Sequence, residues 1–280
     1  MKRAEKHYIH IRIPALFLVL IMLLSMASCS HSEDSPAAEE PSESPFDSLG
    51  VEIEPPEIKP LAPIPPETSL ELPSPTPSQL LPPNIPEQPR ADDDFFADAA
   101  FMGNSLMDGF RMFSGIATSD YFAVTSMTVL GVSSSVCVTL DNGAAGTIID
   151  GLTQKPYGKI YTLLGINEIG MAVDAFIEEY GSMLDKIIAA QPDCDIYVMG
   201  ITPVSQAKSS SHELFNMPRI NEYNAALKEL AADKGCYYMD LVEALAGEDG
   251  FLPAAETSDG VHFSASLYET WAEYVRTHYV

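Results

Sequence analysis

The chain has 280 residues, and its 40 acidic side chains outnumber its 15 basic ones, which gives a formal net charge of −25. A chain of this length holds one or two domains. The strong negative charge argues against a nucleic-acid-binding protein and against docking to an anionic lipid surface through a basic patch. The composition changes twice along the chain, so the sequence divides into residues 1–29, 30–90 and 91–280.

Residues 1–29 have the pattern of a targeting segment. A positively charged start precedes an apolar stretch from Ile13 to Ala27. This stretch is shorter than the ~20 residues that a membrane-spanning helix needs. The pattern therefore predicts a secretory signal peptide.

The apolar stretch ends in MASC, residues 26–29, which resembles the lipobox of bacterial lipoproteins. The resemblance implies that Cys29 carries a lipid and becomes the mature N-terminus. The protein is then expected to be anchored to the outer face of the cell membrane. Lipoboxes usually have Leu where Met26 stands. The alternative is ordinary cleavage after Ala27, since Ser25 and Ala27 form a small-x-small site.

Residues 30–90 contain most of the chain's 22 prolines. Proline fixes φ and removes a backbone donor, so this segment is expected to form neither a helix nor a central strand. It also buries too little apolar surface to offset the entropy of ordering. We predict a disordered, semi-rigid linker that rises about 3.1 Å per residue where it adopts polyproline II. It would tether a single globular domain, residues 91–280.

Residues 91–280 alternate short apolar runs with longer segments of helical periodicity. Continuous apolar runs predict strands that are buried on both faces, and apolar residues at helical spacing predict amphipathic helices. In chain order, the expected elements are strands at 99–104, within 121–131 and at 159–167, a helix at 171–192, a strand at 195–204, a helix at 220–235, a strand at 236–241 and a helix at 264–280. This alternation indicates a three-layer α/β/α sandwich with about five parallel strands.

Polar residues and glycines follow the predicted strands, at the edge where parallel sheets bind ligands. Ser105 follows the first strand, Gly131 the second and Asn167 the third, and Asp259 and His262 precede the last helix. This set supplies a serine nucleophile, a histidine base and an aspartate that fixes the histidine tautomer. The backbone N–H groups of Ser105 and Gly131 and the side-chain amide of Asn167 could form an oxyanion hole.

Four sequence blocks carry these residues: FMGNSLMDGF, VLGVSS, LLGINEIG and DGVHFS. In this order they resemble the four blocks of the SGNH hydrolases, also called the GDSL esterase/lipase family. The resemblance implies the flavodoxin-like SGNH hydrolase fold and a serine esterase that needs no metal or organic cofactor. It also implies that Ser105, Asp259 and His262 form the catalytic triad. Ser105, Gly131 and Asn167 would form the oxyanion hole.

Two positions depart from the family pattern. Asn104 stands where the first block usually has Asp, and Glu168 stands where the third block usually has Asp. Neither position belongs to the triad, so the departures bear on the fine tuning of the activity and not on the class of enzyme. The second block is loosely defined, and Gly143 or Gly146 could take the place of Gly131.

The resemblance implies a carboxylic ester as substrate, either a small ester or an acylated glycan. Anchoring through a long linker suits work in or beyond a cell-wall layer, so removal of acetyl groups from glycans is the leading expectation. The alternatives are a lysophospholipase or thioesterase, an O-acyltransferase that shares the acyl-enzyme, and a surface-binding module that has lost catalysis. Apart from the substrate, the expected partner is the membrane, through Cys29, and not nucleic acid.

Several other side chains have a structural interpretation. We expect Cys137, Cys194 and Cys236 to be buried thiols, although an extracytoplasmic chain could join two of them in a disulfide. Trp271 lies in an amphipathic helix and is expected in the core. The acidic run at 92–94 is expected to be the solvated start of a helix.

Overall fold

The computed structural model describes residues 85–280. The predicted signal peptide, the lipid attachment site Cys29 and the predicted linker up to residue 84 lie outside the described residues.

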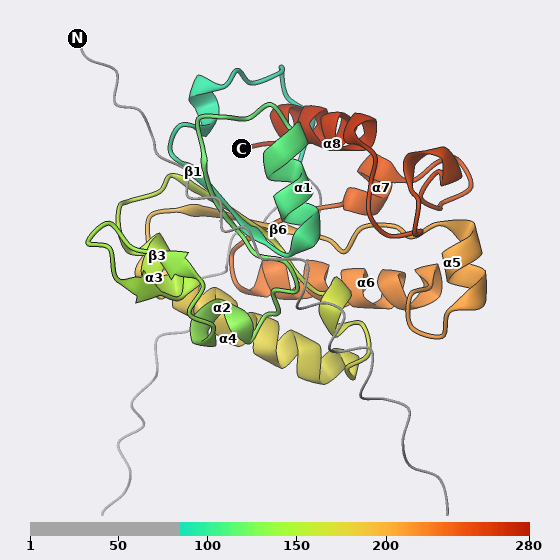
Figure 1. The fold of residues 1–280 in the computed structure, drawn as a ribbon, viewed down its shortest axis with the longest axis horizontal. Coiled ribbons are helices and arrows are strands. Elements are labelled where there is room, and N and C mark those ends of the chain that lie inside the picture. The colour runs from blue at the N-terminus through green and yellow to red at the C-terminus, as the bar shows by residue number, and fades with distance from the viewer. Residues whose placement is uncertain (1–84) are drawn as a thin grey trace, which may run out of the picture. The chain divides into compact units, whose positions relative to one another are not determined.

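Five parallel strands form the centre of the described chain (Figure 1). They lie in the order β2-β1-β5-β6-β7, which confirms the predicted parallel sheet and the α/β fold class. The strands are β1 (Ala99–Gly103), β2 (Asp120–Ala123), β5 (Lys159–Leu163), β6 (Asp195–Met199) and β7 (Tyr237–Met239).

Helices cover both faces of this sheet (Figure 1). One face carries α1 (Ser105–Phe113), α7 (Leu241–Leu245) and α8 (Ala265–Thr277). The other face carries α2 (Gly131–Ser134), α3 (Ile148–Leu152), α4 (Val173–Ala190) and α6 (Met217–Asp233). The smaller elements are the helix α5 (Gln206–Ser211), the 3-10 turns η1 (Asp94–Phe96), η2 (Ile166–Glu168) and η3 (Ala254–Glu256), and a two-stranded antiparallel ribbon of β3 (Val138–Thr139) and β4 (Ala145–Gly146).

The winding direction of the chain reverses between β1 and β5. From β1 the chain crosses to β2 at one edge, returns past β1 to β5, and then proceeds through β6 to β7 at the other edge. The segments that follow β1 and β5 therefore leave toward opposite faces, α1 toward one and α4 toward the other (Figure 1). Ligands of open parallel sheets bind in the crevice that such a reversal creates. Ser105 and Asn167 lie at this crevice, one after each strand.

A row of aromatic side chains crosses the whole sheet. Strand pairing places Tyr121, Phe101, Tyr161, Tyr197 and Tyr237 beside one another on five neighbouring strands. The ring centroids of neighbouring members lie between 4.5 and 5.3 Å apart, a favourable separation for aromatic pairs. The row crosses β1 and β5 at the middle residue of each strand, Phe101 and Tyr161, and so holds the neighbouring strands of the sheet together.

The second strand ends earlier than the sequence suggested. β2 stops at Ala123, and a turn follows in which the N–H of Met127 donates to the carbonyl of Val124. Ser126 adopts a φ of 63° in this turn, a left-handed conformation that ends an extended strand. The prediction that Gly131 directly follows the second strand is therefore wrong. Gly131 instead begins the short helix α2.

The three cysteines of the described chain are free, and they differ in burial. Cys236 is buried and Cys194 is half-buried, and each directly precedes a core strand, β7 and β6 respectively. The prediction of burial is wrong for Cys137, which is exposed because it precedes the surface ribbon of β3 and β4. Trp271 is fully buried, which confirms that it belongs to the core.

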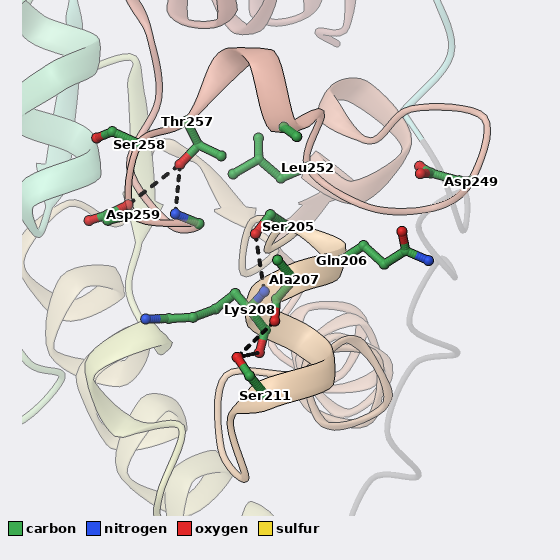
Figure 2. A pocket seen from close by; sticks show the side chains of 12 residues that line it. Ser205, Gln206, Ala207, Lys208, Ser211, Asp249, Leu252, Thr257, Ser258 and Asp259 are labelled. Carbon is green, nitrogen blue, oxygen red and sulfur yellow. Dashed lines mark hydrogen bonds between the residues drawn. The ribbon is translucent and has the colours of Figure 1, made fainter.

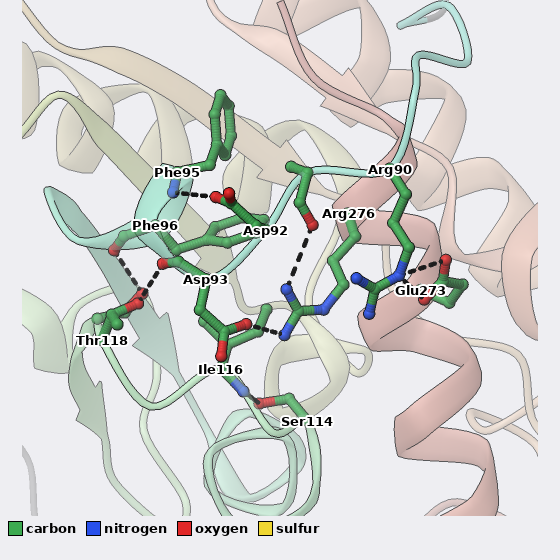
Figure 3. Close-up of polar contacts among 12 residues, drawn as sticks. Arg90, Asp92, Asp93, Phe95, Phe96, Ser114, Ile116, Thr118, Glu273 and Arg276 are labelled. Carbon is green, nitrogen blue, oxygen red and sulfur yellow. Dashed lines mark hydrogen bonds and ion pairs between the residues drawn. The ribbon is translucent and has the colours of Figure 1, made fainter.

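The described chain begins with an N-terminal strap, residues 85–94, that lies along the end of α8 (Figure 3). The N–H of Ala91 donates to the carbonyl of Arg276 at 2.8 Å. The Arg276 guanidinium is buried and pairs with Asp93 at 2.6 Å. Ile85 is also buried, so packing begins six residues before the expected start of the domain at residue 91. Two further contacts join strap and helix, Gln88 N–H to Thr277 O and Arg90 to Glu273.

The acidic run at 92–94 forms the start of a short helix, in agreement with its sequence pattern. The exposed Asp92 accepts the N–H of Phe95 at 3.2 Å, and the 3-10 turn η1 begins at Asp94. Among residues 85–280, no helix is both long and apolar enough to span a bilayer.

Candidate active site

The carboxyl end of β1 is built to present Ser105. A Cβ atom at Gly103 would lie 2.5 Å from the carbonyl oxygen of Leu163, so only glycine lets β1 approach β5 this closely. Asn104 follows in an extended conformation, and its Oδ1 accepts the N–H of Leu106 at 3.0 Å. This is the bond of a helix N-cap. Ser105 is therefore the first residue of α1, where backbone N–H groups have no partner within the helix.

Asn104, which stands where the family usually has Asp, keeps the helix-capping role of that position. Its side chain is fully buried and keeps the oxygen that caps α1. Its Nδ2 group has no hydrogen-bond partner among the described residues. Asn104 thus preserves the local turn and adds an unpaired NH₂ group, with two donor hydrogens, beside the nucleophile.

A chain of hydrogen bonds joins Ser105, His262 and Asp259. The Oγ of Ser105 lies 3.0 Å from Nε2 of His262. On the other side of the same ring, Nδ1 lies 2.7 Å from Oδ2 of Asp259. An ionised carboxylate only accepts hydrogen bonds, so Asp259 requires the proton on Nδ1. The lone pair of Nε2 then faces the serine hydroxyl, which is the arrangement of a general base.

The loop at 257–262 holds the aspartate in place through its own backbone. Oδ1 of Asp259 accepts the N–H groups of Val261 at 2.9 Å and of His262 at 2.8 Å. Gly260 has a φ of 85°, a left-handed conformation that suits glycine, and its N–H donates to Oγ1 of Thr257 at 2.9 Å. One carboxylate thus orients the imidazole with Oδ2 and the turn with Oδ1.

These bonds also set the charge state of Asp259. Partial burial acts to raise its pKa, but the hydrogen bonds from the His262 ring and from the N–H groups of His262 and Val261 outweigh it. The net effect holds the pKa of Asp259 well below its usual range. The carboxylate is therefore ionised throughout the neutral range and can stabilise an imidazolium.

Sequence reasoning missed Thr257. Its hydroxyl oxygen accepts the Gly260 N–H and lies 3.5 Å from Oδ1 of Asp259. A threonine two residues before an Asp-Gly pair is a signal for a side-chain-stabilised turn. The segment TSDG, residues 257–260, carries this signal and indicates Thr257 as a residue that positions the loop.

The opposite side of the crevice carries Asn167 and Glu168 in the 3-10 turn η2. Nδ2 of Asn167 donates to the carbonyl of Met127 at 2.8 Å, which leaves its second amide hydrogen for another acceptor. Oε1 of Glu168 accepts the N–H of Val129. Both side chains thus hold the segment 127–131 against the end of β5.

Glu168 carries a buried carboxyl group. Desolvation raises its pKa, although the N–H of Val129 acts in the opposite direction. Its second oxygen, Oε2, has no hydrogen-bond partner among residues 85–280. The charged form of Glu168 is therefore disfavoured by the fold.

Gly131 lies at the start of α2, beside this contact. Its N–H donates to Oγ1 of Thr128 at 3.1 Å, so the predicted oxyanion donor already has an acceptor. The two competing glycines belong to the surface ribbon. Gly143 makes its turn with a φ of 81°, and the carbonyl of Gly146 accepts the N–H of Cys137.

Two cavities lie near these residues. The first, which we name the α5 pocket, has a volume of about 520 Å³ (Figure 2). It is lined by residues 205–208 and 211, by Asp249, Leu252 and Ala254, and by residues 257–260. The second has a volume of about 250 Å³ and adjoins Asn167, with Val129, Leu130, Met171 and Phe176 among its lining residues. In the described part of the chain, no group of three or more His, Cys, Asp or Glu side chains is placed to hold a metal ion.

Comparison with known proteins gives one family. A sequence model of the GDSL-like Lipase/Acylhydrolase family matches residues 101–270, from β1 into α8. The matched span includes all five residues that were predicted for the triad and the oxyanion hole, namely Ser105, Gly131, Asn167, Asp259 and His262. No curated protein matches the chain.

Comparison with solved structures gives matches at low sequence identity, and those with a TM-score above 0.5 share the fold. A Streptococcus pneumonia protein provisionally named a platelet activating factor has a TM-score of 0.52 and 18% identity, over 64% of this chain and 81% of that one. A protein of Parabacteroides merdae ATCC 43184, provisionally named a GDSL-like lipase, has a TM-score of 0.51 and 12% identity, over 68% and 96% of the two chains. A carbohydrate acetylesterase from Sinorhizobium meliloti has a TM-score of 0.45 and 12% identity, over 64% and 96%.

Proposed function

This chain belongs to the GDSL-like lipase/acylhydrolase family, and we propose that it is a lipid-anchored, extracytoplasmic serine esterase that removes acyl groups from glycans. The observation that carries the chemistry is the unbroken series of hydrogen bonds from Asp259 through His262 to Ser105. The nucleophile of this series stands at the N-terminus of α1.

In the first half-reaction, Ser105 Oγ forms a bond to the ester carbonyl carbon while its proton passes to Nε2 of His262. Asp259 stabilises the imidazolium that results. When the tetrahedral intermediate collapses, its bond to the alcohol oxygen breaks, and His262 returns the proton to that leaving oxygen. The acyl group remains on Ser105 as an ester.

In the second half-reaction, water repeats these steps on the acyl-enzyme. His262 takes a proton from the water as its oxygen attacks the acyl carbon. The proton then passes to Ser105 Oγ as the carboxylic acid leaves. Each half-reaction thus uses the imidazole once as base and once as acid.

The negative charge on the carbonyl oxygen needs donors that point to the same side of the crevice. The N–H of Ser105 is one, because the first turn of a helix leaves it unpaired and the helix dipole favours a negative charge there. The second amide hydrogen of Asn167 is another. Gly131 is the third, once its N–H breaks the hydrogen bond to Oγ1 of Thr128 and donates to the oxyanion instead.

Location and substrate complete the proposal. The cysteine that follows the apolar leader, Cys29, would hold the enzyme at the outer face of the membrane, and the proline-rich segment would give it reach. An esterase held there meets acylated wall or environmental glycans. Replacement of Cys29 by Ala, with the leader cleaved after Ala27, should move the protein from the membrane fraction to the soluble fraction of the cells. Retention in the membrane fraction of a Cys29→Ala variant whose leader has been cleaved would contradict the anchor.

The esterase activity is tested with the mature chain and p-nitrophenyl acetate, with Ser105→Ala beside it. Loss of a triad nucleophile is expected to reduce kcat by about 10⁴- to 10⁶-fold. Ser210→Ala serves as the control, because this serine is an exposed residue of α5 outside the α5 pocket. Release of acetate from acetylated xylan then tests the glycan substrate. Equal rates of the wild type and Ser105→Ala would exclude Ser105 as the nucleophile.

A further inference from the structure

The geometry of the triad determines on which side the alcohol half of an ester must lie. His262 protonates the leaving alcohol oxygen, so this oxygen must come within hydrogen-bond distance of Nε2. The carbonyl oxygen must instead face Asn167 and the N–H of Ser105. The alcohol half therefore extends from Ser105 toward the loop at 257–262, which carries His262.

The α5 pocket lies on this loop. Thr257, Ser258, Asp259 and Gly260 line one side of it, and residues 205–208 of the α5 segment line the other (Figure 2). The two sides are in close contact at Gly260, where an added Cβ would lie 2.7 Å from Oγ of Ser205. The N–H of Ser205 also donates to the carbonyl of Gly260 at 3.0 Å. One short turn thus separates the pocket from the base and holds both in fixed relation.

The lining of the α5 pocket combines polar and apolar surface in similar amounts. Its polar lining residues include Gln206, Lys208, Ser258 and Asp249, and its only large apolar residue is Leu252. Figure 2 shows the Lys208 side chain reaching toward the side on which Asp259 lies. An apolar ligand would strip these groups of water without replacing the lost hydrogen bonds. A ligand rich in hydroxyl groups would pair with them.

The size of the pocket and the contrast with its neighbour support the same ligand class. About 520 Å³ lies within the range of small-molecule sites, roughly 300 to 1,000 Å³. The cavity beside Asn167 is smaller and is lined largely by apolar side chains, including Val129, Met171 and Phe176. The two sides of the crevice therefore differ in polarity as the two halves of a sugar ester do.

We propose that the α5 pocket binds the alcohol half of the substrate, and that this half is a neutral oligosaccharide chain. The proposal rests on ester hydrolysis at Ser105 and specifies the substrate for it. Gln206 and Ser258 are its specificity-determining residues, because both are exposed, lie on opposite sides of the pocket and carry uncharged donors and acceptors.

The first experiment measures binding without turnover. The mature Ser105→Ala chain is titrated with xylohexaose, cellohexaose and chitohexaose by calorimetry. We expect at least one of them to bind, and the double variant Gln206→Ala/Ser258→Ala on the same background to raise its Kd about tenfold. The control Ser210→Ala on that background, which changes a serine of α5 outside the pocket, should bind as tightly as the parent.

The second experiment compares two substrates of the active enzyme. In the double variant, kcat/KM for the acetylated form of the bound oligosaccharide should fall about tenfold relative to kcat/KM for p-nitrophenyl acetate, mainly through KM. Circular dichroism of the double variant verifies that it is folded.

The outcomes separate this proposal from the esterase function. If p-nitrophenyl acetate is hydrolysed but none of the three oligosaccharides binds, the esterase stands and the sugar assignment of the α5 pocket is overturned. The same holds if an oligosaccharide binds but the double variant does not weaken it. If oligosaccharides bind and no ester is turned over, the pocket is a sugar site and the proposed catalysis fails.

Discussion

The two sides of the crevice are prepared for catalysis to different degrees. On one side, Ser105, His262 and Asp259 are already joined by hydrogen bonds across 157 residues of sequence. On the other side, the amide of Asn167 and the N–H of Gly131 donate to acceptors in the segment 127–131. In the proposed mechanism, the proton-transfer half is thus assembled before substrate arrives, whereas the Gly131 N–H of the anion-binding half must leave Thr128 when charge develops. The following variants test this difference, beginning with the largest expected effect.

Asp259→Asn should break the assembled side. The two backbone N–H groups at Oδ1 would retain the amide oxygen, so the new NH₂ group would face Nδ1 of His262. The ring would then carry its proton on Nε2 and could not accept one from Ser105. We expect kcat for p-nitrophenyl acetate to fall about 10⁴-fold with KM little changed. Asp193→Asn, on the surface before β6, is the control. A loss of less than tenfold would show that Asp259 does not set the tautomer.

Asn167→Ala should weaken the anion-binding side. It removes the donor that remains after the bond to Met127, and it also releases that loop contact. Loss of one oxyanion donor is expected to reduce kcat by about 10²- to 10³-fold. Asn221→Ala, on the exposed surface of α6, controls for the loss of an asparagine. If KM rises while kcat is unchanged, Asn167 contacts the substrate without stabilising the transition state.

Thr128→Val sharpens the comparison, because it frees the N–H of Gly131 without removing it. If this N–H must leave Thr128 in every cycle, kcat should rise about 2- to 10-fold, the net value of one hydrogen bond. Thr128→Ser keeps the acceptor and should behave as the wild type. A lower kcat in Thr128→Val alone would instead assign Thr128 to the stability of the turn and remove Gly131 from the oxyanion hole.

Glu168→Gln gives the smallest expected effect, and it depends on pH. Burial raises the pKa of Glu168, so the folded state binds a proton that the unfolded state releases. The free energy of unfolding of the wild type therefore falls as pH rises from the unfolded pKa through the folded pKa. Glutamine mimics the protonated form at every pH and retains an acceptor for Val129.

The Glu168→Gln variant should thus melt at a higher temperature than the wild type at pH 7.5, with no advantage at pH 4. We expect the gain to stay below the ~2–4 °C that 1 kcal/mol represents in a domain of this size. Differential scanning calorimetry at the two pH values measures it, with Glu269→Gln on the exposed face of α8 as the control. An equal difference at both pH values would show that the charge of Glu168 is not responsible.

The features that the sequence predicts well are those set by local patterns. The apolar runs around Phe101, Tyr161 and Tyr197 predict strands, because burial on both faces leaves no polar positions. Position after a strand places Ser105 and Asn167 at one edge of the sheet, since all the strands run in the same direction.

The features that the sequence did not predict depend on tertiary contacts. The apolar residues Met127, Val129 and Val132 suggested that the second strand continues beyond Ala123. They are buried without forming a strand, because the left-handed turn at Ser126 ends the extended backbone. The acceptor that Thr128 offers to Gly131 also arises only from this turn. The α5 pocket combines two segments about 50 residues apart, so no local pattern indicates it.

The N-terminal strap determines how a pulling force enters the domain. A load applied to the chain before residue 85 first meets the hydrogen bonds of Gln88 and Ala91 and the ion pair between Asp93 and Arg276. These contacts pass the load to α8 before it reaches β1. A force applied before residue 85 would therefore strain the strap before it strained β1, the strand that precedes Ser105.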